Sequence, residues 1–222
     1  ATRTLDVLRA LAIARGHACA LEDLHEWLWP DADGAQAKAA CDQALHRLRR
    51  LLDAPDAIVQ RGAQLRLAQD QVWVDLDAWE AEVARALQVG VAGAEGLMER
   101  AFSRFSGPPF QGTTVAPWAL AAVERAAGRF LELSVRLGRR HEARGDHESA
   151  RTVYLRALDF FPTSERCHEA LIRGRVAQGD AAAALEHYDR CDRVLRAARG
   201  EGASPALAAL VAPFRARTSR AG

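Results

Sequence analysis

The side chains best suited to recognition chemistry lie on one face of a helix that hydrophobic periodicity predicts over residues 35–52. Apolar residues recur along the other face and form the expected core stripe: Cys41, Leu45, Leu48 and Leu52, with Ala37 and Ala44 at its margin. The exposed face carries no carboxylate and becomes basic toward its end: Gln36, Ala39, Gln43, His46, Arg47 and Arg50. Any surface helix has a polar outer face, so the residue types must supply the argument.

Those residue types suit contact with duplex DNA. A glutamine can form two hydrogen bonds to adenine, and an arginine can hold guanine or a phosphate. The small Ala39 would let the backbone come near a thymine methyl. This face is therefore a candidate DNA-reading surface.

The neighbouring elements predict a winged helix-turn-helix. Shorter helices are expected over residues 2–15 and 21–28, and residues 58–61 and 64–67 form a hairpin that turns at Gly62. Residues 72–74 are a candidate third strand. Three short helices followed by a hairpin are typical of this motif, and Arg61 and Arg66 would then lie along the phosphates as a wing does.

The charge of this region favours a different interpretation. Residues 1–75 contain nine basic and eleven acidic side chains. DNA-binding modules usually carry a basic surface, because neutralisation of phosphates supplies much of their affinity. Asp42 and Asp53 also flank the proposed DNA face. A region that docks a protein is therefore the alternative.

The rest of the chain predicts a second, helical domain. We place the boundary close to Asp75, which gives domains of residues 1–75 and 76–222, with helix breaks near 90–94, 106–117, 145–146, 162–164, 179–180 and 200–205. A repeat of 34 residues aligns Gly145-Asp146 with Gly179-Asp180, Ala150 with Ala184, and Tyr154 with Tyr188. This is the tetratricopeptide arrangement of stacked helical hairpins, which implies either a groove for a partner or helices that only bury one another.

One set of side chains has the composition of a zinc site: Cys167, His168, His187 and Cys191. Cys167 and His168 are adjacent in a predicted helix and point about 100° apart, so both can rarely bind one ion. Packing cysteines and a capping histidine explain the set better, and no metal is expected. All four cysteines of the chain are scattered, which fits reduced thiols in a cytoplasm.

Composition and motifs exclude several classes of protein. The sequence has no nucleophile elbow, phosphate-binding glycine loop or H-E-x-x-H motif, so neither an enzyme nor a cofactor is expected. With 49% hydrophobic and 27% charged residues, the 222-residue chain has the composition of a soluble, mainly α-helical protein. It shows neither a membrane-spanning apolar run nor a signal peptide.

Several strings resemble the bacterial transcriptional activator domain family, known from regulators of antibiotic biosynthesis. The winged-helix part is matched by Leu24-His25-Glu26-Trp27-Leu28-Trp29-Pro30-Asp31 and Ala44-Leu45-His46-Arg47-Leu48-Arg49-Arg50-Leu51-Leu52. The helical part is matched by Val72-Trp73-Val74-Asp75 with Trp79, His168-Glu169-Ala170-Leu171, Tyr188-Asp189-Arg190-Cys191 and Ser204-Pro205-Ala206-Leu207. The resemblance covers roughly residues 5–210.

The resemblance implies a transcription activator with a mainly α fold, built from a winged helix and a tetratricopeptide-like domain. Its third helix would enter the major groove of promoter DNA through Gln36, Ala39, Gln43 and His46, and its phosphate contacts would be Arg47, Arg50, Arg61 and Arg66. Its helical domain would contact RNA polymerase, a sister protomer in a homodimer, or another regulator. The alternative remains a protein-interaction adaptor that does not bind DNA.

Three features depart from the family's pattern. The chain starts directly at the first helix without the small sheet that opens the family's winged helix, Ala20 replaces the usual Ser or Thr cap of the second helix, and no aromatic residue stands near Leu65. Trp27, Trp29 and Trp73 are expected to be packing residues at the junction of the two domains. The turn-rich segment 106–112 either binds a partner or only crosses between helices.

Overall fold

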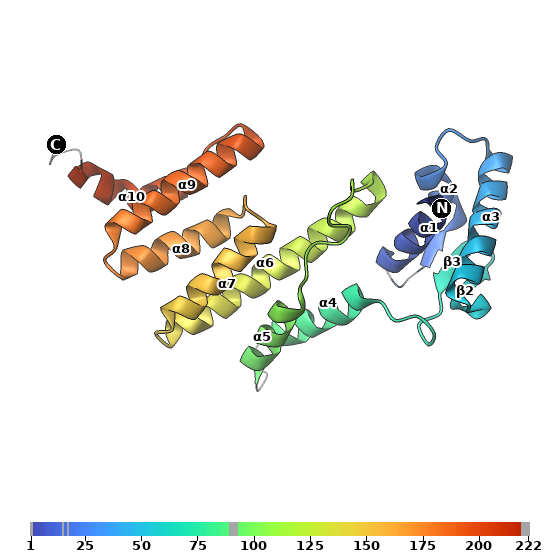
Figure 1. Cartoon of the computed structure of the whole chain (residues 1–222), viewed down its shortest axis with the longest axis horizontal. Coiled ribbons are helices and arrows are strands. Elements are labelled where there is room, and N and C mark those ends of the chain that lie inside the picture. Colours follow the sequence, from blue (N-terminus) through green and yellow to red (C-terminus); the bar gives the residue numbers. More distant parts are fainter. Residues whose placement is uncertain (1, 15, 17, 89–92, 219–222) are drawn as a thin grey trace. The chain divides into compact units, whose positions relative to one another are not determined.

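The computed structural model describes residues 2–14, 16, 18–88 and 93–218 and divides the chain into two compact units (Figure 1). The first unit consists of Ala1–Ala78 with Pro109–Glu124, and the second of Trp79–Pro108 with Arg125–Gly222. The fold is mainly α-helical with one small sheet, as predicted.

The first unit is a three-helix bundle with a three-stranded antiparallel sheet. Its elements are α1 (Thr2–Ile13), β1 (Ala18–Ala20), α2 (Leu21–Leu28), α3 (Gly34–Leu52), the 3₁₀ turn η2 (Pro55–Ala57), β2 (Ile58–Arg61) and β3 (Gln64–Leu67). Apolar side chains from each helix and from the hairpin form one core, including Leu11, Leu24, Leu45, Leu65 and Leu67. Burial of this shared core is what holds the short helices and strands together.

The prediction of a third strand at residues 72–74 is wrong. The third strand is β1, which pairs with β3 so that Cys19 lies opposite Leu65. Val72 and Val74 instead pack against the core from an irregular segment. The short apolar run that suggested a strand therefore packs on the core through its two valines without pairing with another strand.

The N-terminus of α2 lacks a side-chain cap, as the sequence predicted. Ala20 has extended backbone angles, and its side chain cannot accept a hydrogen bond from the helix. The structure replaces part of the missing cap, because the backbone N–H of Leu21 donates to the carbonyl of Ala63 at 2.8 Å. The hairpin turn thus satisfies one of the free donors at this helix start.

A segment from later in the chain, Pro109–Glu124, belongs to the first unit. Trp118, in the 3₁₀ turn η3 (Pro117–Ala119), stacks on Trp27 with ring centroids 6.2 Å apart. Phe110 packs edge-on against Trp118, and the guanidinium of Arg9 lies over the Phe110 ring. The first unit therefore completes its surface with residues that lie beyond the predicted boundary at Asp75.

The tryptophans differ in their environment. Trp27 packs on Trp118, and Trp29 is half-buried against the core of the first unit. The expectation that Trp73 packs is wrong, because its side chain is 77% exposed. Val72 and Val74 occupy the core side of this segment, which leaves Trp73 on the solvent side.

The helices of the second unit follow the predicted breaks. They are α4 (Asp75–Ala86, which begins in the first unit), α5 (Ala94–Arg104), α6 (Leu120–Ala143, likewise), α7 (His147–Phe160), α8 (Glu165–Ala177), α9 (Ala181–Arg199) and α10 (Pro205–Thr218). Helices α7 to α10 pack on their neighbours along the chain (Figure 1). The part of the predicted break near residues 90–94 that falls on 90–92 lies outside the described residues.

The predicted 34-residue repeat is confirmed in the geometry of its turns. Gly145 and Gly179 have φ of +78° and +77°, the left-handed conformation that glycine adopts without strain. The carboxylates that follow, Asp146 and Asp180, each accept a bond from the N–H three residues on, at 3.1 and 3.0 Å. Identical caps at the repeat spacing explain why two stretches of different sequence form the same hairpin.

The small and aromatic positions of the repeat are buried as expected. Ala150 and Ala184 are almost fully buried, as are the two tyrosines, Tyr154 and Tyr188. The backbone of Gly138 lies against the Tyr154 ring, where an added Cβ would come within 2.3 Å of ring atoms. Glycine is therefore required at this position of α6 by the aromatic ring of α7.

The two histidines considered above as zinc ligands, His168 and His187, are joined by a hydrogen bond. His168 is 3% exposed, and its Nδ1 lies 3.0 Å from Nε2 of His187, while its Nε2 lies 2.9 Å from the carbonyl of Pro162. Because a carbonyl only accepts, His168 Nε2 donates to Pro162, and His168 Nδ1 accepts from His187. Burial lowers the pKa of both rings, and the neighbouring His168 helps to lower that of His187 to about 4.

This pair makes the second unit sensitive to acid. The unfolded chain binds a proton at each histidine near pH 6.5, whereas the folded unit keeps the rings neutral. The contribution of this pair to the free energy of unfolding should be complete above about pH 6.5. It should fall by about 2 kcal/mol between pH 7 and pH 5, because the unfolded chain gains the protons that the folded unit excludes. Urea unfolding at both pH values measures this, and His187→Gln should reduce the difference.

The control is the exposed His147 on α7. His147→Gln should retain the full pH dependence of the parent chain. A His187→Gln variant with an unchanged pH dependence would contradict the assignment to the buried pair.

The stacking of Trp118 on Trp27 predicts a contribution to the stability of the first unit. Trp118→Ala should lower its free energy of unfolding by about 1–3 kcal/mol, because a partly buried aromatic pair is lost. Urea unfolding followed by tryptophan fluorescence measures the change. The matched control, Trp73→Ala, should cost less than about 0.5 kcal/mol, and equal costs for both variants would refute the packing role of Trp118.

Candidate nucleic-acid interface

Helix α3 is defined at both ends by its own sequence. The Asp33 carboxylate accepts a hydrogen bond from the backbone N–H of Gln36 at 2.8 Å and caps the first turn. Asp53 ends the helix in the left-handed conformation, with φ of +49°. These ends fix which residues lie on the helix.

Burial of one face fixes the rotation of α3 about its axis. The predicted apolar stripe is confirmed, with the following residues buried: Ala37, Cys41, Ala44, Leu45 and Leu48. Leu52, at the end of the stripe, is half-buried against the same core. Rotation of the helix would expose this stripe, so the opposite face must point outward.

All six residues predicted for that opposite face are exposed: Gln36, Ala39, Gln43, His46, Arg47 and Arg50. Within the part of the chain that the structure describes, neither Arg47 nor Arg50 forms an ion pair or a hydrogen bond through its side chain. Both guanidinium groups therefore keep their donors available to a ligand. Lys38 and Asp42 are also exposed and border this face.

Arg49 has a different role, which the sequence did not reveal. Its guanidinium donates to the carbonyl of Ile58 at 3.1 Å and so joins the end of α3 to β2. The side chain is half-buried, unlike its neighbour Arg50. Arg49 thus positions the helix relative to the hairpin, whereas Arg47 and Arg50 on either side of it remain exposed to solvent.

Arg61 and Arg66 lie on the outer face of the sheet and are both exposed. Leu65 and Leu67 point into the core, so the alternation along β3 turns Arg66 the opposite way. In the antiparallel register Arg66 lies opposite Val59, and Arg61 lies opposite Gln64. Within the described residues, no hydrogen bond or ion pair joins these arginines to the exposed face of α3.

The outer face of the sheet is shallow and mixed in charge. A hollow over the hairpin is lined by Ala18, Val59, Arg61, Gln64, Arg66, Leu67, Ala68, Gln69 and Asp70. Asp70 partly offsets the two arginines. The positive charge that the hairpin presents is therefore smaller than the positive charge on the exposed face of α3.

One cluster in the second unit has ligand types for a metal. Within the described ranges, Glu95, Glu99 and His141 bring one ligand atom each to within 4.8 Å of one another. Arg144 already forms an ion pair with Glu95, and its guanidinium lies 3.0 Å from His141 Nδ1. A cationic side chain thus occupies the charge position that a metal ion would take, and we assign no metal here.

No helix in the described ranges is both long and apolar enough to cross a membrane.

Two of the three departures from the family's pattern are seen in the structure, namely the uncapped α2 and a hairpin with no aromatic residue near Leu65. Strand β1 gives the sheet its third strand.

Comparison with known proteins places the chain in a family. The model of the bacterial transcriptional activator domain matches residues 74–214. The solved structure of Mycobacterium tuberculosis EmbR in complex with a low-affinity phosphopeptide has a similar fold, with a TM-score of 0.65 and 20% identity over 95% of this chain. The match spans 58% of the EmbR chain, and no curated protein matches the sequence. The chain belongs to the bacterial transcriptional activator domain family.

Proposed function

We propose that this protein is a transcription regulator, an activator, that binds promoter DNA through α3 and the hairpin. The observation that carries the proposal is the exposed face of α3, which has amides and unpaired guanidinium groups but no carboxylate. Membership of the bacterial transcriptional activator domain family supports the assignment to gene regulation. In this proposal Gln36, Ala39, Gln43 and His46 face the bases.

Arg47 and Arg50 hold phosphates in this proposal, and Arg61 and Arg66 extend the contact along the backbone. Phosphate contacts set affinity and orientation, while base contacts set sequence preference. Arg49 supports the arrangement indirectly, because it joins α3 to β2.

The second unit contacts RNA polymerase, another regulator or a second copy of the chain in this proposal. Its hairpins stack with the repeat geometry that presents extended surfaces to proteins in other repeat architectures.

A protein-interaction adaptor is the second candidate. The excess of acidic over basic residues in 1–75 favours it, as do the exposed carboxylates of Asp42 and Asp53 beside the α3 face. An adaptor would show no salt-dependent DNA binding, and it would lose its protein partner when the concave face of its helical domain is altered.

The DNA proposal predicts a specific response to charge removal. The full chain should bind a duplex from its own upstream region at low salt and weaken steeply as salt rises. Arg47→Ala with Arg50→Ala should weaken all sequences alike and reduce the slope of log affinity against log salt by about 2. Fluorescence anisotropy with a labelled duplex measures both quantities.

Two further variants separate the effect on sequence preference from the effect on overall DNA affinity. Gln43→Ala should mainly relax the preference for the upstream duplex over a mixed one. The double variant Arg129→Ala with Arg140→Ala removes the same charge from exposed positions of α6 and should leave binding unchanged. Loss of affinity in this control, or intact affinity in the α3 variant, would disprove the assigned face.

A further inference from the structure

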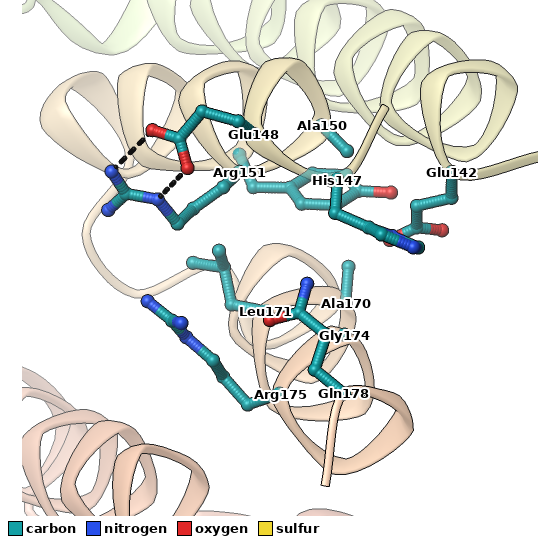
Figure 2. Close-up of a pocket in the computed structure, with 11 residues that line it drawn as sticks. Glu142, His147, Glu148, Ala150, Arg151, Ala170, Leu171, Gly174, Arg175 and Gln178 are labelled. Atoms are coloured by element: carbon teal, nitrogen blue, oxygen red, sulfur yellow. Dashed lines mark hydrogen bonds and ion pairs between the residues drawn. The ribbon is translucent and has the colours of Figure 1, made fainter. Parts of the chain in front are cut away.

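Two hollows of the second unit adjoin one another and form a groove along α6, α7 and α8. The larger, of about 200 Å³, lies between α7, α8 and the end of α6 (Figure 2). The smaller, of about 100 Å³, is lined mainly by α6 and α8. Both include Glu142, Tyr154 and Ala170 in their lining. Small and apolar residues form much of the rest of the groove: Val135, Ala150, Leu171 and Gly174.

The acidic and basic side chains that line this groove are positive in sum. The basic ones are five arginines: Arg139, Arg151, Arg166, Arg173 and Arg175. The acidic ones are three glutamates: Glu142, Glu148 and Glu169. An excess of guanidinium groups beside apolar side chains favours a ligand that is both anionic and partly apolar.

Three of these arginines already have a carboxylate partner. The pairs are Arg173 with Glu169 at 2.8 Å, Arg151 with Glu148 at 2.7 Å, and Arg175 with Asp180 at 3.7 Å. The second of these pairs lies at one end of the larger hollow, and Glu142 lies at the other (Figure 2). Glu142 interacts with the Tyr154 hydroxyl, because burial and this carboxylate together raise the pKa of Tyr154. The carboxylates of the groove are therefore engaged with neighbours other than the two remaining arginines.

Those two arginines, Arg139 on α6 and Arg166 on α8, come from different helices and line the same smaller hollow. Within the part of the chain that the structure describes, neither forms an ion pair or a hydrogen bond through its side chain. Both are exposed, so an incoming ligand can reach them. The groove therefore presents two guanidinium groups whose donors are available, next to Val135 and Ala170.

We propose that this groove binds an acidic segment of a partner protein in which apolar residues separate the carboxylates. Carboxylates of the segment accept hydrogen bonds from Arg139 and Arg166, whose planar guanidinium groups suit this geometry. Its apolar side chains pack against Ala150, Ala170 and Leu171. The inference rests on the proposed function, in which the second unit contacts a protein, and it names the chemistry of that partner.

The glutamates of the groove favour a protein segment over a nucleic acid. Glu142 and Glu169 lie among the arginines that line the smaller hollow. A nucleic acid carries a negative charge on every nucleotide, so its phosphates would come close to these carboxylates and be repelled. A peptide can place neutral residues opposite them, and its apolar side chains gain contacts that a phosphate backbone lacks.

Fluorescence anisotropy on the full chain tests this with three labelled probes. The first is a blocked acidic peptide, Gly-Glu-Leu-Ala-Glu-Leu-Ala-Glu-Gly. The second has glutamine in place of each glutamate, and the third is a single-stranded oligothymidylate. The acidic peptide should bind saturably and should bind more weakly as salt rises, because exposed charges are screened. The glutamine peptide and the oligonucleotide should each bind at least about tenfold more weakly than the acidic peptide.

Two double variants locate the binding. Arg139→Gln with Arg166→Gln should weaken binding of the acidic peptide by about tenfold, because two charge-assisted contacts are lost. The matched control, Arg129→Gln with Arg140→Gln, removes the same charge from exposed positions of α6 that do not line the groove, and it should bind normally. All four side chains are exposed, so both variants should keep the melting temperature of the parent chain.

The proposal is wrong if the acidic peptide does not saturate the parent chain, or if the glutamine peptide or the oligonucleotide binds equally well. Normal peptide binding by the groove variant, or an equal loss in the control, would also overturn it. Arg47→Ala with Arg50→Ala should leave peptide binding unchanged, and the groove variant should bind the upstream duplex normally. A failure here is therefore distinguishable from a failure of the DNA proposal.

Discussion

Burial of one side of α3 is the constraint on which the candidate interface depends. Cys41, Leu45 and Leu48 can leave water only by facing α1, α2 and the hairpin, and this fixes the rotation of the helix. The polar residues then point outward without any interaction that holds them there. Arg49 adds a second restraint through its bond to Ile58, which ties the helix end to the strand that leads into the hairpin. The same burial that stabilises the unit therefore presents the surface proposed to read DNA.

The second unit contains the same Gly-Asp turn twice, and each turn joins two helices of a hairpin. A glycine in the left-handed conformation reverses the chain, and the aspartate after it caps the next helix. The backbone N–H of each aspartate also bonds to a carbonyl five residues earlier, His141 in one copy and Arg175 in the other. The hairpins differ in what fills them, since Gly138 makes room for Tyr154, whereas Ile172 stands at the equivalent position of the second copy.

Periodic features of the sequence predicted most of the helices. The α3 stripe, the hairpin and the Gly-Asp turns each follow from local spacing, and all three are confirmed. Non-local features were missed. Strand β1 is only three residues long and has no alternating pattern, so only its pairing with β3 reveals it. The contact of Trp118 with Trp27 joins residues far apart in sequence, and no periodicity announces it. The prediction for Trp73 is wrong because it rested on the usual burial of tryptophan, whereas here the neighbouring Val72 and Val74 pack against the core and Trp73 is exposed. For the site, exposure followed from the helix period, but the separate role of Arg49 required the position of β2.

The central claim is that the outward face of α3 contacts duplex DNA. The most direct measurement is the change in backbone amide NMR shifts when the ¹⁵N-labelled full chain is titrated with its upstream duplex at low salt. The account predicts that the largest changes fall on α3 around Gln43, Arg47 and Arg50, followed by the hairpin around Arg61, with α8 and α9 unaffected. Large changes confined to other elements, with the α3 amides unmoved at saturating DNA, would contradict it.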